Sequence, residues 1–170
     1  MNIRRLSVAD AATFRALRLA ALLDKPEAFV VSHEEEMDQP LAHFVKMLAT
    51  RDGQTVFGAF DGDTLVGIAG LKRETLMQLA HKAQVWGMYV AERARGHGVA
   101  RELLLAALAT ARATPGVAKV TLSVDSQNVA AIALYESLGF VVFAREADAV
   151  RLDGQSRDDL QMHLRLDTAP

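Results

Sequence analysis

The chain contains 170 residues, of which 51 % are hydrophobic and 24 % are charged, as in a single folded domain rather than a disordered segment. Its 19 Lys and Arg against 21 Asp and Glu give a formal net charge of −2, which argues against a general role at nucleic acids or membrane surfaces. No cysteine is present, which excludes disulfides, cysteine-ligated zinc and a cysteine nucleophile.

The N-terminal segment predicts a short strand followed by an amphipathic helix. Residues 2–6 have the pattern of a strand, and Ser7 with Asp10 three residues later has the pattern of a helix N-cap. Apolar residues recur at helical spacing over 8–23, with arginines between them. The paired arginines near the N-terminus precede no signal-peptide pattern, and no apolar run reaches the length of a membrane span, so the expected location is the cytoplasm.

The densest charge cluster of the chain follows, in the Glu-Glu-Glu-Met-Asp run of residues 34–38. One interpretation is a solvated loop or helix end, and the other is the wall of a pocket for a cationic group. Pro40 has the place of a first-turn proline, which predicts a second helix that ends near residue 50.

The middle of the chain changes to the period of a sheet. An Asp-Gly-Asp turn at 61–63 joins apolar runs at 55–60 and 64–71, which predicts a hairpin. Residues 73–82 fit either an extension of this hairpin or a loop. The next predicted strand spans 83–90.

A helix at 98–113 and a β-branched strand at 119–124 then predict a βαβ crossover with parallel strands. A polar corner leads into a helix at 129–137, and Gly139 stands where a left-handed C-terminal residue is needed. Two last strands are predicted at residues 140–145 and 159–166, joined around Asp153 and Gly154.

The order of these elements predicts a mixed α/β (α+β) fold in one domain over residues 1–170. Its sheet is expected to be mostly antiparallel, with one central βαβ unit.

The turn that begins the long helix has the chemistry of an anion site. Gly96 and Gly98 follow a strand and precede the helix, so free backbone N–H groups gather at a helix N-terminus, with Arg93 and Arg95 beside them. The alternative is an ordinary strand-to-helix connection with exposed, solubilising arginines.

Two motifs make the chain resemble the GNAT superfamily of acyl-CoA-dependent N-acetyltransferases. The first is [Gln/Arg]-x-x-Gly-x-[Gly/Ala], found here as Arg93-Ala94-Arg95-Gly96-His97-Gly98 between a strand and a helix. The second is Asn-x-x-Ala-x-x-x-Tyr-x-x-x-Gly-Phe, found here in Asn128, Ala131, Tyr135, Gly139 and Phe140. The resemblance covers essentially the whole domain and implies a GNAT-like acyltransferase fold.

The resemblance implies where acetyl-CoA binds. The amides from Arg95 through Ala100 would hold the pyrophosphate, and residues 88–90 would pair through their backbone with the pantetheine arm and supply an amide to the thioester oxygen. The implied cofactor-binding residues are Met88, Tyr89, Val90, Arg93, Arg95, Gly96, His97, Gly98, Val99, Ala100, Asn128 and Tyr135.

Tyr135 has the family's position for a general acid that protonates the leaving thiolate, and its ordinary pKa near 10 suits that role. The alternative for Tyr135 is a core aromatic residue on the apolar face of its helix. Asn128 is expected to bond the pantetheine arm, to cap its helix, or both.

The general base is harder to place. Many relatives use a glutamate on the strand that ends at Val90, but residues 84–90 contain no carboxylate, and Glu92 is expected to face solvent. Glu34 and Glu35 are the candidates for a base or substrate wall, with Glu36 and His33 as further options. The five histidines show no ligand spacing, so no metal site is predicted.

The predicted function is direct transfer of an acetyl group from acetyl-CoA to a primary amine, most simply that of a small molecule, in a ternary complex. Alternatives are a protein N-terminal or lysine acetyltransferase and a sensor that binds acyl-CoA without turnover. No nucleic-acid or membrane partner is expected, and a homodimer is suggested by analogy with relatives alone.

Overall fold

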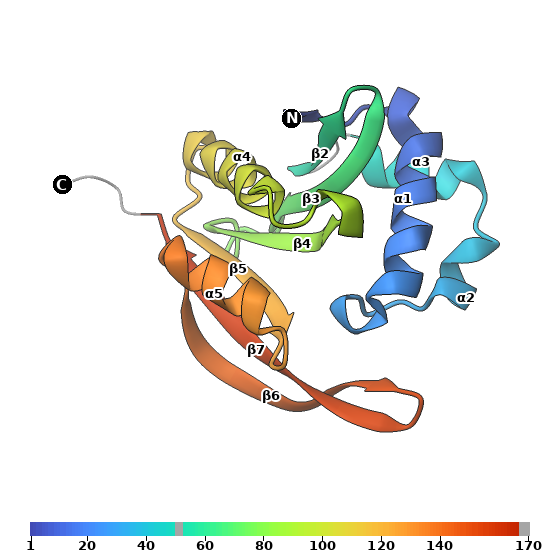
Figure 1. Cartoon of the computed structure of the whole chain (residues 1–170). Helices are drawn as coiled ribbons and strands as arrows, with labels where there is room; N and C mark the ends of the chain where they lie inside the picture. Colours follow the sequence, from blue (N-terminus) through green and yellow to red (C-terminus); the bar gives the residue numbers. More distant parts are fainter. Residues whose placement is uncertain (50–52, 167–170) are drawn as a thin grey trace.

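A seven-stranded sheet organises the protein in the computed structural model, which describes residues 1–49 and 53–166 (Figure 1). Its strands are β1 (Asn2–Arg5), β2 (Gln54–Asp61), β3 (Thr64–Arg73), β4 (Lys82–Val90), β5 (Lys119–Asp125), β6 (Val141–Leu152) and β7 (Gln155–Arg165). They lie in the order β1-β2-β3-β4-β5-β7-β6, and every neighbouring pair is antiparallel except β4 and β5. The predicted mixed fold with one central βαβ unit is confirmed.

The helices cover the two faces of this sheet, and Figure 1 shows α1, α2 and α3 on the opposite side from α4. They are α1 (Ala11–Asp24), α2 (His33–Met37), α3 (Leu41–Leu48), α4 (Val99–Ala113) and α5 (Val129–Ser137). Three short 3₁₀ turns are η1 (Val8–Asp10), η2 (Pro26–Ala28) and η3 (Glu92–Ala94). One apolar cluster joins α4 and α5 to the sheet, and a second joins α1 and α3 to its other face.

The expected elements are present, and three of them differ in detail. The predicted first helix begins as the η1 turn, where Ser7 and Asp10 form a capping box. The acidic run is part of a short helix of its own, α2, rather than a solvated loop or the end of a neighbouring helix. Pro40 is the N-cap of α3 rather than its first residue, and the predicted end of that helix near residue 50 lies outside the described residues.

The C-terminal hairpin of β6 and β7 is much longer than the pattern indicated, although its turn is at Asp153 and Gly154 as predicted. Its outer strand β6 is the edge of the sheet and is exposed from Val141 to Asp148, so burial imposes no apolar alternation there. Residues 74–81 form a loop with turns, which settles the ambiguous stretch before β4.

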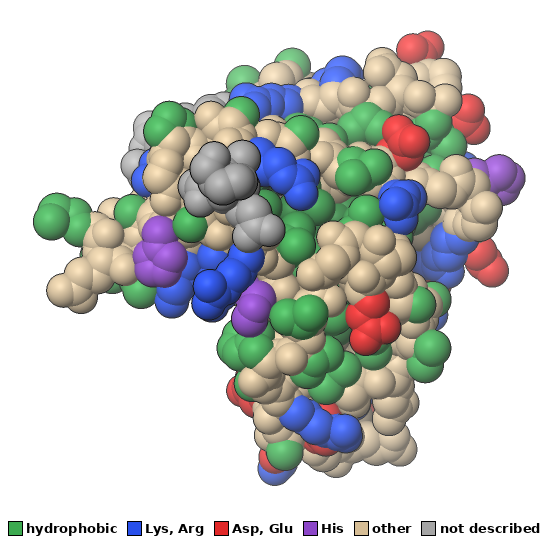
Figure 2. Space-filling view, turned by 90° about the vertical axis from the view of Figure 1, so that its left-hand side faces the viewer, with side chains coloured by type: hydrophobic (Ala, Val, Ile, Leu, Met, Phe, Trp, Pro, Cys, Tyr) green, Lys and Arg blue, Asp and Glu red, His purple; other side chains and the backbone are tan. Residues whose placement is uncertain are grey.

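One row of the sheet concentrates positive charge. Lys82, Lys119 and Arg165 are register partners across β4, β5 and β7. The pKa of His163 is lowered by its burial and then by the nearby Lys119 and Arg165. Figure 2, seen from the side where the C-terminus leaves, shows Lys and Arg side chains grouped beside two histidines. Like charges gather here, although the net charge of the chain is slightly negative.

Residues 1–49 and 53–166 lack two kinds of feature. No helix there combines the length and apolarity needed to cross a membrane. The same residues contain no group of three or more His, Asp or Glu side chains placed to hold a metal ion.

Candidate active site

The two parallel strands separate and leave a cavity between them. Strand β4 pairs with β5 only from Lys82 to Gln84, so the rest of its β5-facing edge has no strand partner among the described residues. The cavity at this divergence has a volume of about 690 Å³. Helix α5, the second half of α1 and the segment around η2 complete its walls. An unpaired strand edge can pair with an extended ligand.

A bulge in β4 lies in the middle of this wall. Ile68 pairs with Tyr89 and Gly70 pairs with Trp86, so β4 carries one residue more than β3 between these two pairs. Gly87 takes a positive φ of 60° there, which a residue with a Cβ rarely adopts. The bulge therefore turns the Gly87–Met88 backbone away from the regular ladder and toward the cavity.

The glycine turn presents a row of backbone donors next to the same cavity. Within the described part of the chain, the amides from Gly96 to Ala100 have no hydrogen-bond acceptor outside α4. Gly96 and Gly98 have φ values of 79° and 77°, and nothing lies within 4 Å of the place where a Cβ would stand. Open space, free amides and the positive end of α4 together suit an anionic group such as pyrophosphate.

Arg95 has a different place from the one expected. Its amide donates to the Glu92 carbonyl at 3.1 Å, so the row of free amides begins at Gly96, and the expectation of a donor at Arg95 is corrected. Its side chain turns back toward the sheet, donates to the Val90 carbonyl at 3.0 Å and forms an ion pair with Asp24 at the end of α1. Arg93 is exposed, as is Glu92, in agreement with the expectation for the glutamate.

Tyr135 lies at the cavity wall formed by α5. Its hydroxyl donates to the sulfur of Met88 at 3.5 Å, so the helix residue and the strand residue predicted at the reacting group are brought together. Its side chain packs against Phe140 with ring centres 6.0 Å apart, and the residue is 7 % exposed. Burial raises the pKa of Tyr135 to about 12, well above the ordinary value assumed from sequence.

Asn128 acts as the N-cap of α5, because its side-chain oxygen accepts from the Ala131 amide at 3.1 Å. It also lines the cavity. The capping role is therefore present, and a contact from its side-chain amide to the pantetheine arm stays a prediction.

The acidic run does not reach the cavity. Glu34 is exposed, and its pKa is lowered, mainly by a hydrogen bond from its own backbone amide. Glu35 is held in a capping box, where its carboxylate accepts from the Ser32 amide at 2.7 Å. Glu36 is buried against Arg18. The structure therefore places neither Glu34 nor Glu35 beside Tyr135 and the β4 wall, although both were candidates for the base.

Three other carboxylates line the cavity, and sequence reading missed all of them. Both oxygens of Asp125 are engaged, by the Gln127 amide and by Arg157, and Asp159 accepts from the Ser123 hydroxyl at 2.7 Å. The one ion pair of Glu27 within the described residues is a long contact to Lys25, at 3.9 Å. Its segment, η2, packs on β5 and β6. Glu27 is therefore the cavity carboxylate with neither oxygen held by a short hydrogen bond in the described part of the chain.

Arg18 was also missed, although the sequence carries a signal for it. It lies four residues after Phe14 and four before Leu22, both of which are buried, so it falls on the apolar stripe of α1. Its Nε and Nη2 each donate to Glu36 at 2.6 Å, and its side chain lines the cavity.

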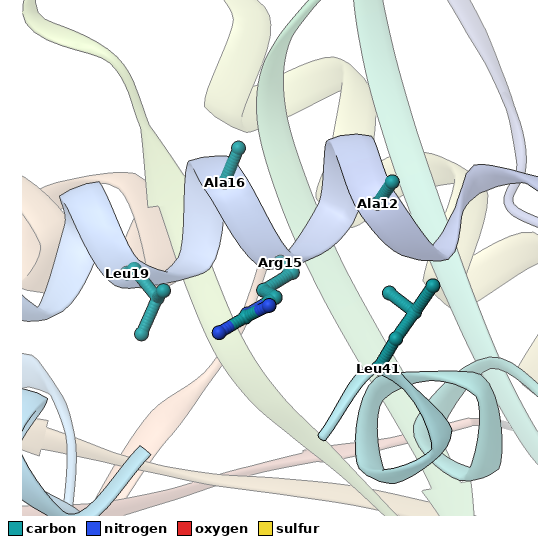
Figure 3. Close-up of a pocket in the computed structure, with 5 residues that line it drawn as sticks. All are labelled: Ala12, Arg15, Ala16, Leu19 and Leu41. Atoms are coloured by element: carbon teal, nitrogen blue, oxygen red, sulfur yellow. The ribbon is translucent and has the colours of Figure 1, made fainter. Parts of the chain in front are cut away.

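A second, smaller pocket of about 400 Å³ lies between α1 and α3. Figure 3 shows Ala12, Ala16 and Leu19 along α1 and Leu41 on α3, with Arg15 the one polar side chain among them. Arg15 donates to the Met37 carbonyl at 2.9 Å. This pocket offers no carboxylate or hydroxyl for proton transfer, so the cavity at β4 and β5 is the candidate active site.

The comparisons with known proteins agree with this geometry. Residues 17–140 match the Acetyltransferase (GNAT) family. A mycothiol acetyltransferase of Brachybacterium faecium is 29 % identical over 137 residues, which are 81 % of this chain but 39 % of that protein, so this chain spans well under half of its length.

Two solved structures have the same fold over almost their whole length. yncA from Salmonella typhimurium, solved with its cofactor acetyl-CoA, is 25 % identical with a TM-score of 0.80, covering 99 % of this chain and 95 % of that chain. A ribosomal-protein-alanine N-acetyltransferase from Brucella melitensis is 26 % identical with a TM-score of 0.81, covering 98 % and 100 %. Since the family match extends over most of the sequence and the fold agrees, the chain belongs to the GNAT family of acetyltransferases.

Proposed function

We propose that this chain transfers the acetyl group of acetyl-CoA directly to a primary amine of a small molecule inside the β4–β5 cavity. The observation that carries the proposal is the edge of β4 without a strand partner beside the amides from Gly96 to Ala100, which have no acceptor outside α4 in the described part of the chain. Membership of the GNAT family, whose acyl donor is acetyl-CoA, supports it.

The turn and the strand would hold the two ends of the donor. The amides from Gly96 to Ala100 and the dipole of α4 would bind the pyrophosphate, with about 0.3–2 kcal/mol from the dipole. The edge of β4 from Met88 to Val90, which has no strand partner among the described residues, would pair with the amide groups of the pantetheine arm, as an added strand does, while the Val90 carbonyl accepts from Arg95. Acetyl-CoA supplies the activated acyl carbon and a thiol leaving group.

Tyr135 would act at the sulfur of the donor. Its hydroxyl contacts Met88 on the cavity wall, where the thioester is expected. With its pKa raised to about 12, the phenol keeps its proton throughout the neutral range. It would stabilise negative charge on the departing sulfur as a hydrogen-bond donor, and full proton transfer to a thiolate with an ordinary pKa near 8.5 would be uphill in this environment.

Glu27 would accept the proton of the acceptor's ammonium group. An amine must lose a proton before it attacks, and Glu27 is the cavity carboxylate with neither oxygen held by a short hydrogen bond. The earlier candidates Glu34 and Glu35 lie outside the cavity and would need a rearrangement of α2 to reach the amine.

A second candidate function has a specific basis. The Brucella structure bears the name of an enzyme that acetylates the alanine of a ribosomal protein, whereas the Brachybacterium relative is named for mycothiol. A protein N-terminus is therefore the alternative acceptor for this chain. A cytoplasmic location and a homodimer stay predictions.

The decisive experiment measures thiol release from acetyl-CoA across a panel of small amines, with peptides bearing free N-termini as a second arm. Turnover with one class of small amine would support the proposal, and turnover with peptides alone would favour the alternative. Silence across both arms, together with a rise in melting temperature on adding acetyl-CoA, would indicate an acyl-CoA sensor instead.

A further inference from the structure

One donor of a buried arginine in the cavity wall has no acceptor. Arg18 is 5 % exposed, and its Nε and Nη2 are both bonded to Glu36. The remaining nitrogen, Nη1, is shielded from solvent and meets no acceptor among residues 1–49 and 53–166. Buried donors of charged groups are almost always paired, so this one calls for a partner.

The space beside Nη1 is created by the glycine of the β4 bulge. A Cβ built on Gly87 would stand 3.5 Å from Arg18 Nη1, and no other heavy atom would lie within 4 Å of it apart from its immediate chain neighbours. The place of a Gly87 Cβ is therefore free of close contacts from other segments and has a hydrogen-bond donor at van der Waals distance. A guanidinium nitrogen can only donate, so the matching ligand atom is an acceptor oxygen.

We propose that Arg18 binds a carbonyl or carboxylate oxygen of the acceptor above Gly87, so that the acceptor is an α-amino acid or its amide rather than a simple alkylamine or polyamine. This rests on the proposed function. Met88, the next residue of β4, contacts the Tyr135 hydroxyl through its sulfur, and both Gly87 and Met88 line the cavity. An acceptor that carries an oxygen close to its amine, as an α-amino acid or its amide does, suits two sites on consecutive residues of one wall.

Glu36 already balances the charge of Arg18, so the site does not require a full negative charge on the ligand. An amide carbonyl and a free carboxylate can each accept the bond. Both kinds of acceptor carry an amine on one carbon and an oxygen on the carbon bonded to it. Experiment decides whether that oxygen belongs to a carboxylate or to an amide.

The test compares glycinamide, glycine and a glycine-initiated peptide with propargylamine, an amine of similar size that has no oxygen. The expected result is a kcat/KM for at least one oxygen-bearing acceptor that exceeds that for propargylamine by about 10- to 100-fold, the worth of a hydrogen bond to a charged group. Preference for glycine identifies a free carboxylate, preference for glycinamide a small amide, and preference for the peptide an N-terminus. Equal rates for all four would overturn the proposal.

Two variants locate the preference. Gly87→Ala places a methyl group beside Arg18 and leaves the Arg18–Glu36 pair intact. The double variant Arg18→Met/Glu36→Met removes the Arg18 donor without leaving a buried charge unpaired. In both variants, the ratio of kcat/KM for the oxygen-bearing acceptor to that for propargylamine should fall close to one. Gly62→Ala is the matched control, because Gly62 has a similar φ of 56° in the distant β2–β3 turn. If folded Gly87→Ala keeps the preference for oxygen-bearing acceptors, the proposed bond from Arg18 to the acceptor oxygen is contradicted.

Binding separates this proposal from the proposed function. If no amine is acetylated, the proposed transfer to a small amine is wrong. The proposed oxygen contact of Arg18 is then tested by calorimetric titration of N-acetylglycinamide into the protein saturated with coenzyme A. An affinity for N-acetylglycinamide that is about tenfold weaker in Gly87→Ala supports the proposed oxygen contact of Arg18. Absent binding, or equal binding by the two proteins, overturns it.

Discussion

Asp24 at the end of α1 forms an ion pair with Arg95 in the glycine turn, and so connects the acceptor side of the cavity to the expected pyrophosphate site. The same carboxylate accepts from the Tyr89 hydroxyl at 3.0 Å. The pKa of Asp24 is lowered, chiefly by its hydrogen bond from Arg95 and further by Tyr89. The Asp24 carboxylate thereby balances the positive charge of Arg95. This reduces the attraction of Arg95 for a second anion such as the pyrophosphate.

Replacement of Asp24 by Asn should therefore change both stability and cofactor binding. Because the pair is partly exposed, its loss should cost about 0.2–1 kcal/mol, a fall in Tm of at most about 4 °C. The lowered pKa means that this stabilisation is present above pH 4 and is lost as the pH falls below it. Arg95 keeps its bond to the Val90 carbonyl, so its uncompensated charge should tighten acetyl-CoA binding at low salt.

Titrations of acetyl-CoA into both proteins at two salt concentrations check this. The advantage of Asp24→Asn should shrink as salt rises. Weaker binding by Asp24→Asn at both concentrations would mean that the carboxylate orders the turn rather than masking the charge of Arg95.

Tyr135→Phe should lower kcat by about 10²- to 10⁴-fold and leave acetyl-CoA affinity nearly unchanged. The hydroxyl has one weak partner, the Met88 sulfur, so its removal leaves no strong buried acceptor unsatisfied. Ser137→Ala removes a hydroxyl from the same helix that bonds to Leu134 and Arg101 instead, and serves as the control. A kcat equal to that of the unaltered protein would exclude a role for the hydroxyl as hydrogen-bond donor to the departing sulfur.

The raised pKa of Tyr135 adds a test by pH. An unfolded tyrosine titrates near 10 and this one at about 12, so the unfolded state loses its proton first. The stabilisation is complete below pH 10 and is lost as the pH rises to 12. Chemical denaturation between pH 10 and 12 should show a fall in the free energy of unfolding, and this fall should be smaller in Tyr135→Phe. Below pH 10, ionisation of Tyr135 should cause no loss in the rate of acetyl transfer.

The sequence predicted those parts of the site that depend on backbone conformation and missed those that depend on packing between distant elements. Gly139 has the positive φ value that its position suggested, and Asn128 caps its helix. Glu27 reaches the cavity only because η2 packs on β5 and β6, a contact between residues far apart in the chain. The sequence indicated only that arginines lie between the apolar residues of the first helix, and no local pattern reveals the glutamate that pairs with Arg18.

Gly98→Val should weaken acetyl-CoA binding about tenfold or more, because a side chain would occupy the open space in front of the free amides. Gly154→Val is a matched control, since Gly154 has the same φ of 77° and also faces open space, at the β6–β7 turn. Backbone strain should cost each variant roughly 1–2 kcal/mol. The rise in Tm on adding acetyl-CoA should shrink only for Gly98→Val, and an equal rise in both would exclude the pyrophosphate site.

Glu27→Gln should reduce kcat about 10²-fold at neutral pH if this carboxylate takes the amine proton, with little change in acetyl-CoA affinity. Glu34→Gln changes an exposed carboxylate outside the cavity, and Glu35→Gln keeps a side chain that can still cap α2, so both variants should retain full rate. The three variants should be assayed from pH 6 to 10, because an amine that is already neutral needs no base. The defect of Glu27→Gln should therefore fade as the pH passes the pKa of the acceptor, whereas a defect that persists there, or one confined to Glu34→Gln or Glu35→Gln, would move the base to another residue.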